Sequence, residues 1–236
     1  MNLINFFQQT IEYFLIMLGI AILIPAFFAW LISYLINRAG SEIISRFGTG
    51  FYLFISSIGV IVHELSHLLL ALFFGHHIEN FHLLQVPKNG QVGFVTHSSN
   101  PKNLWQAFGN LLIGFAPMIG NSLAIYYLTL WLQPEIFSFR VTFNWSLLVW
   151  FLISFSLALG IGLSHEDFQN SLQGLWPALL ILLILAFLFE IINKISINQL
   201  LSFSEKETTL FGLALIIALI ELIIAKIISA IRTCLL

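Results

Sequence analysis

Long stretches without charged residues alternate along the chain with short polar connections. Six apolar segments can each supply the roughly 20 residues that cross about 30 Å of hydrocarbon as a helix. They are residues 13–37, 47–74 (interrupted by Glu64), 103–133, 141–165, 168–189 and 208–231 (interrupted by Glu221 and Lys226). We therefore predict an all-α integral membrane protein with about six transmembrane helices, forming one polytopic domain over residues 1–236. The break between 141–165 and 168–189 is short, and a tight turn or a re-entrant arrangement fits it equally well.

The longest polar connection, residues 75–102, has the pattern of a short β-hairpin between the second and third helices. Residues 81–86 and 91–96 alternate like strands and are joined across Pro87-Lys88-Asn89-Gly90. Asn-Gly favours a type I′ turn because both residues tolerate positive φ. Pro87 cannot donate to a strand ladder and suits a turn or an edge. Gly93 would allow close approach of the backbone, although a strand glycine equally marks a bulge.

Composition supports the lipid bilayer as the surroundings of this chain. Hydrophobic residues make up 59% of the chain and charged residues only 8%, whereas a soluble domain carries about 25% charged residues. The net charge of −2 argues against nucleic acid as a partner. The one cysteine, Cys234, excludes an internal disulfide and a thiolate zinc cluster.

The segment His63-Glu64-Leu65-Ser66-His67 places two imidazoles and a carboxylate inside an apolar run. On a helix, His63 and His67 lie one turn apart on the same face, a spacing at which both can bind one zinc ion. Glu64 is next to that face, where it could accept a proton from water activated by the metal. The alternative is a pair of histidines hydrogen-bonded inside a helix bundle. Burying three ionisable groups in a membrane without partners is costly, which favours the metal.

A hydrolytic zinc site needs a third protein ligand and an open position for water. The later candidates are His76, His77, His82, His97, His165, Glu166 and Asp167. The second helix runs toward residues 75–102, so its histidines face that side of the membrane. Two spans later the chain returns to the same side at residues 164–167. This favours Asp167 as the third ligand and leaves Glu166 and His165 as alternatives. Ser164 to Asp167 also matches a helix capping box. His76 and His77, just after the second helix, could form a weak surface metal site or be solvated loop histidines.

These features together resemble the site-2 protease family of intramembrane zinc metalloproteases. Besides the His-Glu-x-x-His helix, hairpin and later Asp, the run Gly114-Phe115-Ala116-Pro117-Met118-Ile119-Gly120-Asn121 is similar to that family's Gly-Pro-x-x-Asn element. Here Ala116 replaces the Gly, and an extra residue precedes Asn121. The family's Asp usually lies in Leu-Asp-Gly, whereas this chain has Glu166-Asp167-Phe168. The likeness covers roughly residues 50–180, the expected catalytic core.

The resemblance implies His63, His67 and Asp167 as zinc ligands and Glu64 as general base and acid. It also implies substrates that span the membrane or are anchored in it, and a guiding role for the hairpin. It further implies a multi-pass membrane location, which we expect to be the cell membrane of a prokaryote.

Two other functions fit the same residues. One is a metal-ion transporter, although such proteins usually carry ligands on several helices or broken-helix repeats. The other is a non-catalytic relative that binds membrane proteins, which would not need Glu64.

Overall fold

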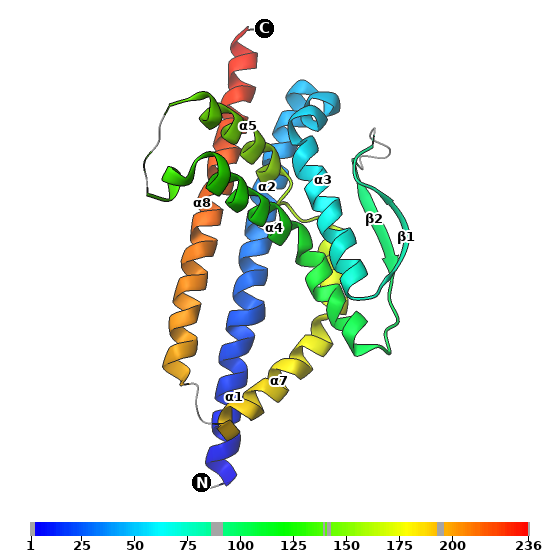
Figure 1. Ribbon diagram of the computed structural model, residues 1–236, viewed down its shortest axis with the longest axis vertical. Coiled ribbons are helices and arrows are strands. Elements are labelled where there is room, and N and C mark those ends of the chain that lie inside the picture. Colours follow the sequence, from blue (N-terminus) through cyan, green and yellow to red (C-terminus); the bar gives the residue numbers. More distant parts are fainter. Residues whose placement is uncertain (1–2, 86–91, 139, 141–142, 193–195, 236) are drawn as a thin grey trace.

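Helices dominate the computed structural model, which describes residues 3–85, 92–138, 140, 143–192 and 196–235. The helices are α1 (Leu3–Leu18), α2 (Ile24–Phe47), α3 (Thr49–Phe73), α4 (Leu104–Leu132), α5 (Trp145–Leu159), α6 (His165–Gln173), α7 (Leu175–Ile192) and α8 (Ile197–Leu235). A π-helical turn, Gly19–Leu23, joins α1 to α2 without a break, so that the two form one long rod (Figure 1). A 3₁₀ helix, Pro134–Ser138, follows α4.

Each of the six predicted apolar segments is helical over most of its length. Within the described residues, four helices are long and apolar enough to cross a membrane: Leu3–Phe47, Thr49–Phe73, Leu104–Leu132 and Leu175–Ile192. Helix α5 is apolar but has only 15 residues, because Asn144 caps its start and the chain leaves the helix at Gly160. These helices agree with a membrane protein, and the number of six spans stays a prediction.

The helices pack in pairs around small cores. Helix α8 runs beside α2 with Ala218 against Ile32 and Ile36, and α7 lies against the α1 end of the rod (Figure 1). Helices α3 and α4 meet through Ala71, Phe74 and Ile113. Many large apolar side chains point outward instead, including Phe54 at 81% exposure. Such an apolar exterior is costly in water and suits contact with lipid.

The predicted β-hairpin is confirmed, but its strands are shifted relative to the prediction. Strand β1 is His77–His82 and strand β2 is Phe94–Ser98, paired antiparallel with His82 opposite Phe94. The strands therefore begin at the end of α3 and stop before the predicted turn, because a Schellman-type helix end turns the chain at Gly75, whose φ is +73°. The predicted Pro87–Gly90 turn falls outside the described residues.

The prediction of a single helix over residues 168–189 is wrong in one respect, because this segment is divided into α6 and α7. Gly160 to Ser164 form an irregular connection after α5, and Ser164 then caps α6. The division falls at Gly174. A Cβ on Gly174 would collide with the main-chain N of Leu111 in α4, so the chain passes α4 too closely for any other residue.

Candidate metal centre

His63 and His67, the two histidines of the His-Glu-x-x-His segment, lie on α3. In both rings, Nδ1 is held by a hydrogen bond to a main-chain oxygen. Nδ1 of His63 donates to the main-chain oxygen of Gly160 over 2.9 Å. Nδ1 of His67 donates to the main-chain oxygen of Ile113 over 2.8 Å. With the proton held on Nδ1, each neutral ring presents the lone pair of Nε2, the arrangement that orients histidine for a metal.

Asp167 of α6 lies opposite both Nε2 atoms. Its Oδ1 is 3.0 Å from His67 Nε2 and its Oδ2 is 3.7 Å from His63 Nε2. The three side chains are mostly buried, with exposures between 9% and 15%. They form the group that could hold a metal ion, with all donor atoms within 4.8 Å of one another. The prediction that the chain brings these residues together is therefore confirmed.

The donor set and its spacing fit zinc. Two nitrogens or oxygens bound to one tetrahedral zinc ion lie about 3.3 Å apart, given metal–ligand distances near 2.0–2.1 Å. The separations of 3.0 and 3.7 Å, each to a different oxygen of Asp167, are near that value, and one ligand atom from each of the three residues lies within 4.8 Å of the others. Three protein ligands also leave a fourth position for water or substrate. The identity of the metal remains a proposal.

Asp167 caps α6 and also faces the two histidines, although the sequence presented capping and metal ligation as competing roles for it. The main-chain N–H of Ser164 donates to Asp167 Oδ2 over 2.7 Å, and the main-chain N–H of Asp167 donates to Ser164 Oγ over 3.1 Å. This capping box holds the start of α6. The carboxylate that faces the histidines is thus fixed by the helix it caps.

Glycines bring the three supporting segments together. A Cβ on Gly59 of α3 would collide with the main-chain oxygen of Ser156 in α5, and a Cβ on Gly114 of α4 would collide with Ser171 and Asp167 of α6. The absent side chains let α5 approach α3 and let α6 approach α4. Gly160 can therefore reach His63, and Asp167 can face the metal position.

Asn121 supports the same region from α4. Its side chain is fully buried, and Nδ2 donates to the main-chain oxygens of Pro117 and Gly160 over 3.1 and 3.0 Å. The Gly160 oxygen therefore accepts from both Asn121 and His63. Nothing in the sequence indicated that Gly160 and Ile113 hold the two histidines. Any residue has a main-chain oxygen, so such an acceptor cannot be recognised from residue type or spacing.

Glu64 lies beneath the hairpin and is 8% exposed. A Cβ on Gly93 would come within 2.7 Å of Glu64 Cγ and 3.1 Å of Glu64 Oε1. The same Cβ would come within 3.1 Å of the main-chain oxygen of His82. The hairpin therefore lies directly against the candidate general base. The close backbone approach expected at Gly93, for which a bulge was the alternative, stays a prediction.

The other candidate ligands lie elsewhere. His165 and Glu166 are exposed on the first turn of α6, and His77 and His82 are exposed on β1. His76 and His97 instead face each other at the base of the hairpin, with their Nδ1 atoms 3.0 Å apart. The expectation of a solvated His76 is thus wrong, because the chain reversal after α3 buries its side chain to 5% exposure.

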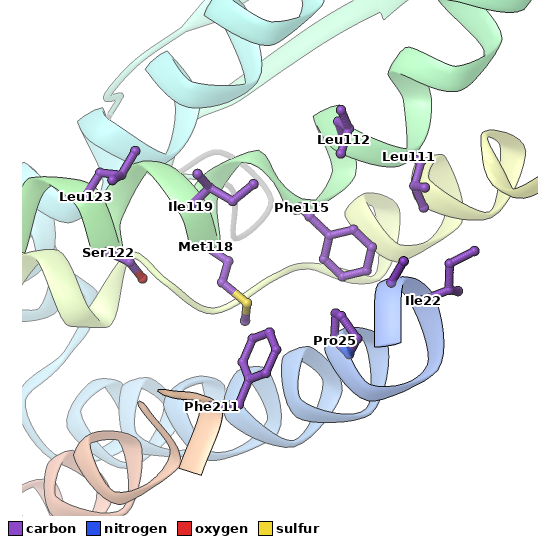
Figure 2. A pocket seen from close by; sticks show the side chains of 11 residues that line it. Ile22, Pro25, Leu111, Leu112, Phe115, Met118, Ile119, Ser122, Leu123 and Phe211 are labelled. Atoms are coloured by element: carbon purple, nitrogen blue, oxygen red, sulfur yellow. The ribbon is translucent and has the colours of Figure 1, made fainter. Parts of the chain in front are cut away.

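A separate apolar cavity of about 440 Å³ lies on another side of α4. Figure 2 shows Phe115 and Met118 of α4, Pro25 near the start of α2 and Phe211 of α8 around it. Ser122 supplies a hydroxyl to this otherwise apolar lining, and none of the four site residues belongs to it. A cavity without ionisable groups cannot supply the chemistry of the metal centre. It is nevertheless near that centre, because Phe115 in its lining contacts Phe168, the neighbour of Asp167.

No protein-family model, no curated protein and no solved structure matches this chain.

Proposed function

We propose that this protein is an intramembrane zinc metalloprotease that hydrolyses peptide bonds of membrane-spanning or membrane-anchored proteins. The observation that carries the proposal is the convergence of His63, His67 and Asp167 on one position, with Glu64 beside them on α3. Two further features support the proposal. The apolar helices suit a protein in a membrane, and the hairpin lies over Glu64, where a substrate could bind.

Each residue has a distinct task in this reaction. His63, His67 and Asp167 would hold the zinc ion, which when bound polarises a peptide carbonyl and makes water more acidic. Glu64 would accept the proton of the attacking water and pass it to the leaving amine. Its burial beneath Gly93 keeps the carboxylate beside the ligands and away from bulk water.

The hairpin suits an extended substrate. A transmembrane helix encloses its peptide bonds in its own hydrogen bonds, so it must unwind before attack. A free strand edge can hold such a segment by strand addition, and the paired strands β1 and β2 end next to Glu64. We expect cleavage where Gly, Pro or Asn weakens a substrate helix near the membrane surface. Replacing these substrate residues by Leu should slow turnover, and an unchanged rate would argue against unwinding.

The decisive experiment compares the purified wild type with Glu64→Gln and Glu166→Gln. Zinc content is measured for each, together with cleavage of a model transmembrane peptide. We expect zinc in all three proteins and cleavage in the wild type and in Glu166→Gln, which alters an exposed carboxylate beside Asp167. Full cleavage by Glu64→Gln would refute the proposed mechanism. Metal flux in reconstituted vesicles that survives Glu64→Gln, without cleavage by the wild type, would identify a transporter instead.

A further inference from the structure

A second group of histidines lies outside the candidate metal centre, at the base of the hairpin. His76 follows α3 and His97 is in β2, and the centroids of their rings are 4.9 Å apart. Gln106 of α4 fixes both ends of this insertion, since its Nε2 donates to the main-chain oxygen of Gly75 and its Oε1 accepts from the main-chain N–H of Asn100. The two rings are therefore positioned by α4 rather than by the hairpin alone.

The outer nitrogens of the two rings are both engaged. His76 Nε2 donates to the main-chain oxygen of Gln106 over 2.9 Å, and His97 Nε2 lies 3.5 Å from the side-chain amide of Asn170 in α6. A half-turn of that amide would present its oxygen to His97 in place of its nitrogen. Both rings can then carry their proton on Nε2, which leaves two Nδ1 lone pairs facing each other.

Two lone pairs at this distance repel unless a proton or a cation lies between them. The Nδ1 atoms are 3.0 Å apart, close to the roughly 3.3 Å that separates two ligands on one tetrahedral zinc ion. His76 resembles His63 and His67 in this respect, because a main-chain oxygen holds one of its ring nitrogens and the other is presented.

Both rings are also kept in the neutral form that ligates metals. Burial, with the neighbouring His76 in second place, lowers the pKa of His97 to about 4. Burial likewise lowers the pKa of His76, against the opposing effect of its hydrogen bond to Gln106. At neutral pH, neither histidine therefore has to lose a proton before binding a cation.

We propose that His76 and His97 bind a second divalent cation of borderline softness, such as zinc, through their Nδ1 atoms, with water completing the coordination. Imidazole suits zinc, copper and nickel rather than magnesium or calcium. Two neutral ligands bind more weakly than the two imidazoles and carboxylate of the first centre, so this site fills at higher zinc concentration. A cation bound by both histidines would link β2 to the end of α3.

The test uses the full-length protein in detergent, dialysed to equilibrium at increasing free zinc, with metal per chain measured by elemental analysis. The wild type should bind two zinc ions in two steps. His76→Gln and His97→Gln should each lose the weaker step and keep the tighter one. His77→Gln, an exposed neighbour, should keep both steps. His67→Gln should lose only the tighter step, which separates this proposal from the first centre. A wild type that saturates at one ion, or variants of His76 and His97 that keep the weaker step, would overturn it.

Spectroscopy of the unmutated chain removes any dependence on how well the variants fold. With ¹⁵N-labelled histidine, zinc added after the tighter step is complete should shift the Nδ1 resonances of His76 and His97 and leave that of His77 in place. Unchanged Nδ1 resonances for His76 and His97 at saturating zinc would show that the pair shares a proton and binds no metal.

Discussion

The carboxylate of Asp167 accepts from the main-chain N–H of Ser164 over 2.7 Å through Oδ2, and its Oδ1 lies 3.0 Å from His67 Nε2. Helix capping and the proposed metal binding thus depend on one side chain. The orientation of Asp167 does not require the metal, because Ser164 already restrains it. A site arranged in this way loses little conformational entropy when the ion binds.

The two tasks of Asp167 can be separated by mutation. Asp167→Asn removes the proposed anionic ligand, so we expect at least a 10-fold loss of zinc affinity, since removing even a hydrogen-bond partner of a ligand costs about 10–100-fold. Ser164→Ala removes only the hydroxyl cap and should cost about 1 kcal/mol of stability with near-normal zinc affinity. Zinc titration and chemical unfolding of both variants test this. Equal zinc affinity for Asp167→Asn and the wild type would exclude Asp167 as a ligand.

Gly93 should be required for activity but not for metal binding. A Cβ at this position would come within 2.7 Å of Glu64 Cγ, so Gly93→Ala has to displace either Glu64, the proposed general base, or the hairpin. A displacement of about 1 Å can lower kcat/KM by about 100-fold. Gly50→Ala is the matched control, because its new Cβ meets nothing within 4 Å. Wild-type kcat/KM for Gly93→Ala would contradict the contact.

The close packing of α3 against α5 should determine how well His63 is held. Gly59→Ala would drive α3 away from Ser156 and draw the Gly160 oxygen off His63 Nδ1. We expect a stability loss of about 1–3 kcal/mol from overpacking and a zinc affinity lowered by about 10–100-fold. Gly212→Ala, in open space on α8, should change neither quantity. Unfolding curves and zinc titrations measure both effects.

Metal removal should destabilise the folded chain. At free zinc about 1,000-fold above its dissociation constant, binding to the folded state alone contributes about 4 kcal/mol. A chelator should therefore lower the melting temperature of the wild type. The double variant His63→Gln, His67→Gln should not respond to the chelator at zinc levels too low for weaker binding. An identical response of both proteins would show that the stabilising metal binds elsewhere.

Much of this arrangement was predictable because it rests on patterns local in sequence. The six apolar segments marked the helices, and the spacing of His63 and His67 placed both rings on one face of α3. Asp167 was reached by counting spans and by resemblance to a family. The helices and the shared face of the two histidines need only the period of a helix and the thickness of a bilayer, whereas the choice of Asp167 also needed the resemblance.

The remainder depends on tertiary contacts. The alternation over residues 81–86 predicted a strand there, yet the pairing begins at His77, because the helix end at Gly75 determines where the strand starts. The division at Gly174 follows from the nearness of α4. The pairing of His76 with His97 requires the register of the hairpin, which the local pattern does not specify.

The unbroken rod from Leu3 to Phe47 has a consequence for the surrounding lipid. Its 45 residues extend over about 67 Å at 1.5 Å per residue, more than twice the thickness of the hydrocarbon layer. Its first turns expose Leu3, Ile4 and Phe7, which are poorly suited to water. The charge-free part of the rod, residues 13–37, covers about 37 Å on the same scale, so a tilt of the rod is enough to fit this part into the hydrocarbon layer. The turns beyond it carry Glu12 at one end and Arg38, Glu42 and Arg46 at the other, and both ends of the rod are expected to lie outside the acyl chains.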